Sequence, residues 1–161
     1  MVRPARLALR IVIALLFALW WGGFTFYAAV VVPIGGRVLG SAIAQGFITQ
    51  PVSDRLNVLG VIVIAALALN VMMLRRDSGA RARRMVALSW VALAITQVVL
   101  VVLHGRLDEM VDLTTRSIVS DRATFYATHR AYLLVATAQW LAAITHAVTV
   151  GLAWSATSNA T

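Results

Sequence analysis

The chain contains no cysteine and no lysine, and only six of its 161 residues are acidic. Without cysteine it has no disulfide bond, no thiolate nucleophile and no iron–sulfur ligand of its own. Charged residues make up 12% of the sequence, against roughly 25% in an ordinary soluble domain. Apolar residues make up 61% and give a mean hydropathy of +0.86. This composition is typical of an integral membrane protein.

Four long apolar runs follow one another along the chain. The first, Ile11 to Ile34, carries no charge and is longer than the apolar core of a signal peptide, so we expect a retained helix. Pro33 with Gly35 and Gly36 predicts its end. About 20 apolar residues suffice to cross a bilayer. We therefore predict one all-α domain over residues 1–161, a polytopic bundle of four transmembrane helices at about 7–34, 54–75, 83–104 and 124–154.

All basic residues are arginines, and they lie unevenly on the two predicted sides of the membrane. The side with both termini holds eight arginines against one acid, and the other side holds six against five. Positively charged segments stay in the cytoplasm, so we predict a multi-pass protein of the cell inner membrane with cytoplasmic N- and C-termini. Because the arginines flank apolar runs, the lipid bilayer is the expected partner, and nucleic acid is not. The eight are Arg3, Arg6, Arg10, Arg75, Arg76, Arg81, Arg83 and Arg84.

The two outer connecting segments are expected to form short helices at the membrane surface. Residues 38–48 are weakly amphipathic, and Pro51 is expected to end their helix. The segment between the third and fourth runs mixes charges with apolar residues at helical spacing, which favours another short helix. The apolar residues at this spacing are Leu107, Met110, Val111 and Ile118.

Polar side chains interrupt the third and fourth runs at intervals of seven residues, which places them on one face of each helix. An unpaired polar group in hydrocarbon costs several kcal/mol, so we expect these stripes to face the interior of the bundle. They are Trp90, Gln97 and His104 in the third run, and Tyr132, Gln139 and His146 in the fourth, interleaved with His129, Ala136 and Ala143.

Helical rise places His104 and His129 at a similar depth near the outer surface, and Gln97 and Gln139 near the middle of the membrane. The two glutamines are expected either to bond to each other or to line a ligand site. The two histidines are either interface residues or ligands of a haem or a metal ion. The predicted ligand-binding residues are thus these four and Tyr132.

Charged residues at the mouth of this site are expected to orient it. Arg130 follows His129, and we expect it to pair with Asp108 or Glu109. These acids also add oxygen ligands, yet too few histidines lie on this side to predict a closed metal site. No catalytic residue is predicted.

Short motifs in the chain resemble those of a family of small four-helix bacterial membrane proteins whose activity is unknown. The first helix carries Trp20, Gly22 and Gly23 in a Trp-x-Gly-Gly pattern and ends in "VVVPIGG". The connector "SAIAQGFITQPVSDRLN" and the aromatic-x-x-His element in "FYATHRAY" are similar to theirs. Copper-resistance membrane domains and anthrone-oxygenase-like proteins look similar at this level. The resemblance implies the fold and topology, and it assigns no copper or oxygenase residue.

Three functions remain open at this point. The first is a non-enzymatic accessory or assembly subunit, which acts through a membrane-protein partner or as a homo-oligomer. The second is a redox or ligand-binding bundle that holds haem, quinone or lipid between the third and fourth helices. The third is a small oligomeric transporter or channel, which the lack of an acid inside the apolar runs disfavours.

Overall fold

The computed structural model describes residues 4–77, 79–112, 114–115 and 117–158 of the chain. Helices account for most of this part, and a two-stranded hairpin connects the last two of them. The elements are α1 (Pro4–Phe26), the π-helical turn η1 (Tyr27–Val31), α2 (Val32–Leu39), α3 (Ala42–Asp77), α4 (Ala80–Glu109), β1 (Val111–Asp112), β2 (Ser117–Ile118) and α5 (Arg122–Ser158).

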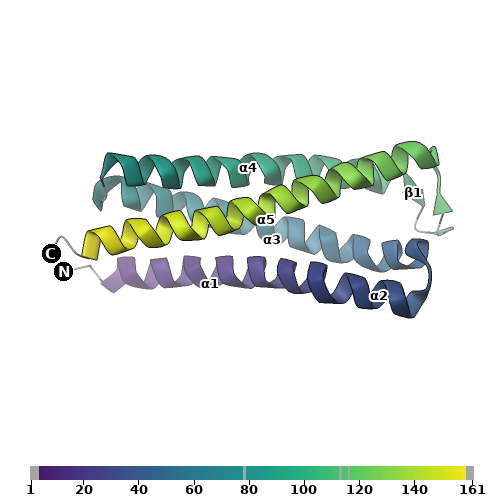
Figure 1. The fold of residues 1–161 in the computed structure, drawn as a ribbon, viewed down its shortest axis with the longest axis horizontal. Coiled ribbons are helices and arrows are strands. Elements are labelled where there is room, and N and C mark those ends of the chain that lie inside the picture. Colours follow the sequence, from purple (N-terminus) through teal and green to yellow (C-terminus); the bar gives the residue numbers. More distant parts are fainter. Residues whose placement is uncertain (1–3, 78, 113, 116, 159–161) are drawn as a thin grey trace.

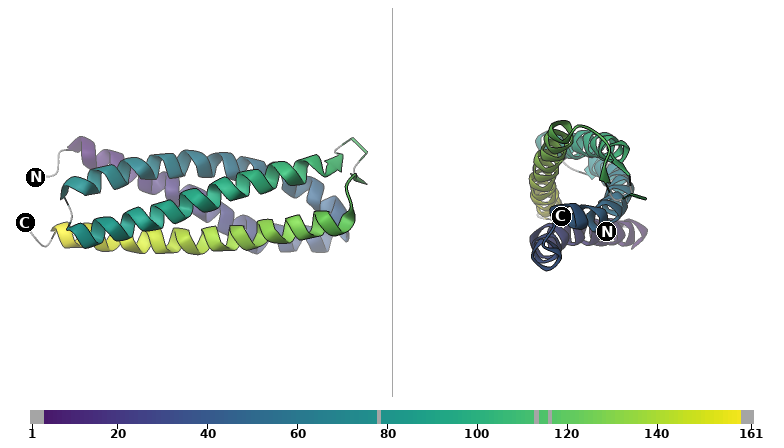
Figure 2. Two further views of the ribbon diagram at one scale, coloured as in Figure 1. Left: turned by 90° about the horizontal axis from the view of Figure 1, so that it is seen from above. Right: turned by 90° about the vertical axis from the view of Figure 1, so that its right-hand side faces the viewer.

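Four long helical rods run side by side (Figure 1). The first of these rods consists of α1, η1 and α2, which form one continuous helical span. The start of α1, the α3–α4 connection and the end of α5 lie at one end of the bundle, here called the terminal end. The hairpin of β1 and β2 and the α2–α3 connection lie at the other, here called the hairpin end. Viewed end-on, α3, α4 and α5 surround the bundle axis, and α1 lies along the outside of them (Figure 2).

The four rods are long and apolar enough to cross a membrane, judged by length and composition. Large apolar side chains are exposed along their outer surfaces, for example Leu15, Val98 and Leu134. This arrangement is compatible with a multi-pass membrane protein, because lipid solvates such surfaces and water does not. The predicted helical bundle is confirmed at this level.

The seven-residue stripes predicted for the third and fourth helices do face the interior. Gln97, His104, Gln139 and His146 are buried, as are the alanines of the interleaved positions. Between the glutamines and the terminal end, two apolar clusters fill the interior. The first is centred on Val63, Leu67, Leu93 and Ala143, and the second on Val71, Leu74, Val86 and Val150.

The sequence predicted that the first helical span ends near Pro33. In the structure this span continues through η1 and α2 to Leu39. Proline lacks an N–H and its ring crowds the carbonyl four residues earlier, so it disturbs an α-helix. Here the wider π-helical turn η1 comes directly before it, and Pro33 sits in the first turn of α2, where proline is tolerated. The helix ends instead at Gly40, whose φ of 59° is left-handed and suits glycine.

The predicted separate surface helix over residues 38–48 is wrong, because residues 38–39 end α2, residues 40–41 connect the two helices, and residues 42–48 form the first turns of α3. The α3 helix begins after Ser41, whose Oγ accepts a hydrogen bond from the Ala44 N–H at 3.3 Å, as an N-cap does. Pro51 lies inside α3 and does not end a helix. It costs the helix one bond, to the Phe47 carbonyl, and membrane helices tolerate this loss when neighbouring elements hold the segment.

The predicted helix between the third and fourth runs is also wrong. The α4 helix continues to Glu109, and the chain then turns through the antiparallel pair β1–β2, in which Val111 opposes Ile118. A local competitor to the helix explains the difference. The carboxylate of Asp112 accepts bonds from the N–H groups of Thr114 and Thr115, which fixes a turn in place of a helix.

Candidate functional site

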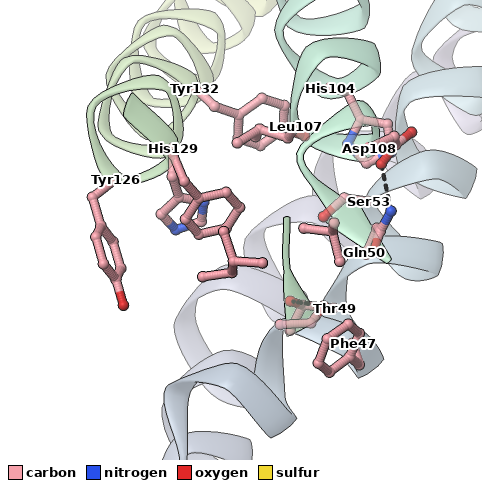
Figure 3. A pocket seen from close by; sticks show the side chains of 14 residues that line it. Phe47, Thr49, Gln50, Ser53, His104, Leu107, Asp108, Tyr126, His129 and Tyr132 are labelled. Atoms are coloured by element: carbon pink, nitrogen blue, oxygen red, sulfur yellow. Dashed lines mark hydrogen bonds and ion pairs between the residues drawn. The ribbon is translucent and has the colours of Figure 1, made fainter. Parts of the chain in front are cut away.

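A cavity lies at the hairpin end of the bundle, enclosed by α3, α4, the hairpin and the start of α5 (Figure 3). Its volume is about 170 Å³. An apolar cavity of about 150 Å³ holds one benzene ring, whereas drug-sized molecules occupy roughly 300 Å³ or more. The cavity therefore suits one compact ring. It is lined by Gly46, Phe47, Thr49, Gln50, Ser53, His104, Leu107, Asp108, Val111, Ile118, Phe125, Tyr126, His129 and Tyr132.

Asp108, near the end of α4, provides the negative charge in the wall of the cavity. Its Oδ1 accepts a hydrogen bond from Gln50 Nε2 of α3, drawn as a dashed line in Figure 3. Its Oδ2 lies 3.7 Å from Nε2 of His104, one turn earlier on α4. That Nε2 is buried and has no hydrogen-bond partner in the described part of the chain. The His104 ring thus lies in the cavity wall with its Nε2 buried beside a carboxylate, and the partly exposed Asp108 carboxylate is the acceptor that a ligand can reach.

Tyr132 provides a hydroxyl group from the α5 side of the cavity. Its ring centroid lies 6.0 Å from that of His104. Its oxygen accepts a hydrogen bond from Asn57 Nδ2 at 3.4 Å. Because the oxygen is the acceptor in that bond, the hydroxyl hydrogen remains for donation to another group. Tyr132 can thus donate to an oxygen atom of a ligand.

Beneath the cavity, a chain of amide hydrogen bonds crosses three helices. Gln139 Nε2 of α5 donates to Gln97 Oε1 of α4 at 2.7 Å. Gln97 Nε2 in turn donates to the backbone carbonyl of Asn57 on α3 at 3.1 Å. The Asn57 side chain completes the chain by holding Tyr132. All three amides are buried, so their bonds hold the floor of the cavity in one arrangement.

The third wall is the first part of α3, which the preceding helical span holds in place. Gln45 Nε2 of α3 donates to the Val32 carbonyl. The Tyr27 hydroxyl of η1 donates to the Thr49 carbonyl at 3.1 Å. The π-helical turn thus contributes a side chain that anchors the proline-containing segment of α3 beside the cavity.

The hairpin covers the cavity with the apolar side chains of Val111 and Ile118. Its turn depends on Asp112, which also accepts a bond from the Thr115 hydroxyl at 2.8 Å. The hydroxyl of Thr115, followed by the N–H groups of Thr114 and Thr115, stabilises the charged carboxylate and lowers the pKa of Asp112. A charged Asp112 is therefore part of the folded hairpin.

Asp121 begins α5 in a similar way. Its Oδ2 accepts bonds from the Thr124 N–H at 2.9 Å and from the Thr124 hydroxyl at 3.0 Å. This is an N-cap with a negative charge at the positive end of a helix. The backbone bond from Thr124, followed by the hydroxyl bond, lowers the pKa of the Asp121 carboxyl.

The predicted ligand residues fall into two groups. His104, His129 and Tyr132 border the cavity. Gln97 and Gln139 do not border it, and they bond to each other beneath it. The two histidines lie on different walls, and of them His104 alone is buried.

The predicted orienting pair takes a different form. Arg130 is exposed on α5, and in the described residues no ion pair joins it to Asp108 or Glu109. Asp108 contacts Gln50 and His104 instead. The prediction placed the start of the second helix after Gln50, so it missed this partner.

Sequence reasoning also missed the contribution of α3 to the site. Gln50, Asn57, Ile64 and Val71 are seven residues apart, the same spacing that identified the stripes of the third and fourth helices. Asn57, Ile64 and Val71 are buried. The stripe is visible in the sequence once the helix is allowed to begin before Pro51.

The described residues contain no group of three or more histidine, cysteine or acidic side chains placed to hold a metal ion. Comparison with protein families, with curated proteins and with solved structures finds no match for this chain. The functional argument therefore depends on the geometry of the cavity.

Proposed function

We propose that this chain is a multi-pass membrane protein with cytoplasmic termini that binds the compact ring of a lipid-soluble molecule, such as a quinone, in the cavity at the hairpin end. The observation that best supports this proposal is the cavity itself. It is a single-ring volume with mainly apolar walls and two polar groups that a ligand can reach, the Tyr132 hydroxyl and the Asp108 carboxylate.

The two polar groups match the chemistry of a quinone. A quinone carbonyl accepts a hydrogen bond, which the Tyr132 hydroxyl can donate. A reduced quinol donates a hydrogen bond, which the Asp108 carboxylate in the cavity wall can accept. The site thus has a partner for each redox form, whereas a haem exceeds the volume of the cavity.

The depth of the cavity suits a ligand that arrives from the bilayer. The α3 helix has 36 residues and is about 54 Å long, which exceeds a hydrocarbon core of about 30 Å. The cavity lies at one end of this length, beside Gln50 and Asp108, and hence at the level of the lipid head groups. A ring can enter there while its apolar tail stays in the membrane. This proposal needs no catalytic step and corresponds to the second of the three functions that the sequence left open, the ligand-binding bundle.

A binding measurement with one matched pair of variants tests the proposal. The purified protein in nanodiscs is titrated with a short-tailed benzoquinone, and the quenching of tryptophan fluorescence is followed. Tyr132→Phe removes the donor and is expected to weaken binding about 5- to 10-fold, the effect of one hydrogen bond worth about 1 to 1.4 kcal/mol. Tyr126→Phe is the control, because the Tyr126 hydroxyl points away from the cavity (Figure 3).

Two results would overturn the proposal. One is the absence of saturable quinone binding by the unaltered protein. The other is an equal loss of affinity in the two tyrosine variants, since that would mean that the Tyr132 hydroxyl makes no specific contact.

A further inference from the structure

A second polar group lies deep in the bundle, closer to the terminal end, and the proposed ligand does not use it. It consists of Asn70 on α3, Ser89 on α4, and His146 and Thr149 on α5, here called the polar layer. His146 is 1% exposed and Asn70 is 2% exposed. We propose that the polar layer is an internal hydration site, in which one water molecule bridges His146 Nε2 and Asn70 Oδ1.

The members of the polar layer lie at one level of the bundle. On α3, Asn70 stands between Leu67 of the first apolar cluster and Leu74 of the second. On α5, His146 stands between Ala143 and Val150, which belong to the same two clusters. Each is three residues from the first cluster and four from the second, which is about 4.5 Å and 6 Å along the helix.

Ser89 occupies the corresponding position on α4, between Leu93 of the first cluster and Val86 of the second. Three buried side chains thus lie at one level on three helices, of which α4 packs against both α3 and α5. The buried clusters on either side of this level each contain residues of both α3 and α5, so the Asn70 and His146 side chains enter one common interior.

The hydrogen bonds within the polar layer leave two atoms unsatisfied. Ser89 Oγ lies 2.9 Å from His146 Nδ1 and 3.2 Å from Thr149 Oγ1. It also donates to the Val86 carbonyl at 2.9 Å. By contrast, His146 Nε2 and Asn70 Oδ1 are buried and have no hydrogen-bond partner in the described part of the chain. Unpaired buried polar atoms are rare in folded proteins and call for a partner.

Water satisfies both atoms whichever ring nitrogen of His146 carries the proton. If the proton is on Nδ1, which then donates to Ser89, a water molecule donates one hydrogen to Nε2 and the other to Asn70 Oδ1. If the proton is on Nε2, the same water accepts from Nε2 and donates to Oδ1. A metal ion fits less well, because the layer provides a single imidazole and no carboxylate.

The hydration site is separate from the cavity at the hairpin end. The first apolar cluster, with the buried Leu93 and Ala143, lies between the polar layer and the glutamine pair. The Phe17 ring of α1 covers His146 from one side, at 6.4 Å between centroids. A water molecule held there is enclosed, as buried structural waters are.

Nuclear magnetic resonance of the full-length protein tests this proposal, because the chain has three histidines and their signals can be separated. Histidine labelled with ¹⁵N and ¹³C is incorporated, and His146→Phe assigns the signals of His146. We expect magnetisation transfer from water to the Hδ2 proton of His146, which neighbours Nε2. We also expect its loss in Asn70→Leu, which removes the second partner of the water at nearly constant volume.

Asn57→Leu is the matched control, because it makes the same change on α3 outside the polar layer. Transfer that persists in Asn57→Leu and disappears in Asn70→Leu supports the hydration site. Absence of transfer in the unaltered protein overturns it, and this measurement needs no variant to fold. Transfer that survives in Asn70→Leu, or is lost equally in both variants, also overturns it.

Discussion

At the scale of single residues, Gly60 is the glycine at which an added Cβ would meet the shortest contacts. A Cβ built on Gly60 would overlap Gln97 Oε1 and lie 2.9 Å from Trp20 Nε1. The first of these atoms is the acceptor for Gln139. Glycine at this position on α3 therefore lets α1 and α4 bring polar atoms close to the α3 backbone.

We predict that Gly60→Ala destabilises the bundle by about 1–3 kcal/mol, the usual effect of overpacking a filled interior. The methyl group must displace Gln97 and so disturb its bond to Gln139. Thermal unfolding in detergent, followed by circular dichroism, measures the effect.

Gly151→Ala is the control for this variant, since nothing lies within 4 Å of a Cβ at Gly151. Alanine is the better helix former by about 1 kcal/mol, so this control is expected to be neutral or stabilising. A Gly60→Ala protein as stable as the control would contradict the close approach.

At the scale of elements, the sequence was most informative where one pattern repeats over a whole helix. The spacing of seven in the third and fourth helices identified inward-facing residues, and the expected meeting of Gln97 with Gln139 is observed as a hydrogen bond. Helical rise also placed His104 and His129 at one depth, and both border one cavity. Periodicity predicts the facing of side chains well, because burial of one face is what the repeat encodes.

The sequence was least informative at helix ends. Pro33 and Pro51 both suggested helix ends that the structure does not have, because the effect of a proline on a helix depends on its neighbours. The π-helical turn η1 precedes Pro33, and contacts with neighbouring elements hold the first turns of α3 around Pro51. Likewise, small residues often mark a close approach between membrane helices, yet nothing lies within 4 Å of a Cβ at Gly22 or Gly23. Such outcomes depend on tertiary contacts, which no local pattern contains.

The start of α5 gives a prediction about pH. The folded-state pKa of Asp121 is lowered from its ordinary value of 3.8, so its stabilising contribution is present at pH values above 3.8. It is lost as the pH falls below 3.8 and through the folded-state pKa. We therefore expect the amide proton shift of Thr124, whose N–H bonds to the carboxylate, to titrate with a midpoint below 3.8.

In Asp121→Asn, which keeps a capping oxygen but cannot ionise, this titration should disappear. A midpoint at or above 3.8 in the unaltered protein would show that the hydrogen bonds from Thr124 do not favour the charged form.

At the scale of the whole molecule, the two ends of the bundle differ in charge. The sequence that belongs to the hairpin end has six arginines and five acids, while the sequence that belongs to the terminal end has eight arginines and one acid. The start of α1, the end of α5 and the α3–α4 connection lie together at the terminal end (Figure 1). Because the number of helical rods is even, the start of α1 and the end of α5 lie on the same side.

This charge difference leads to a prediction of orientation. Positively charged segments next to membrane helices stay in the cytoplasm, and acids count little in this bias, so the terminal end should be cytoplasmic and the hairpin end outside. A reporter that is active only outside the cytoplasm should therefore be inactive when fused after Thr161 and active when inserted in the hairpin next to Thr115.

Replacing Arg75, Arg76, Arg81, Arg83 and Arg84 together should weaken this preference for orientation, because five of the eight positive charges that determine it are removed. Single replacements should not, since each charge near an anionic surface contributes only about 1 kcal/mol. Strong reporter activity after Thr161 in the unaltered chain would reverse the orientation and place the cavity on the cytoplasmic side.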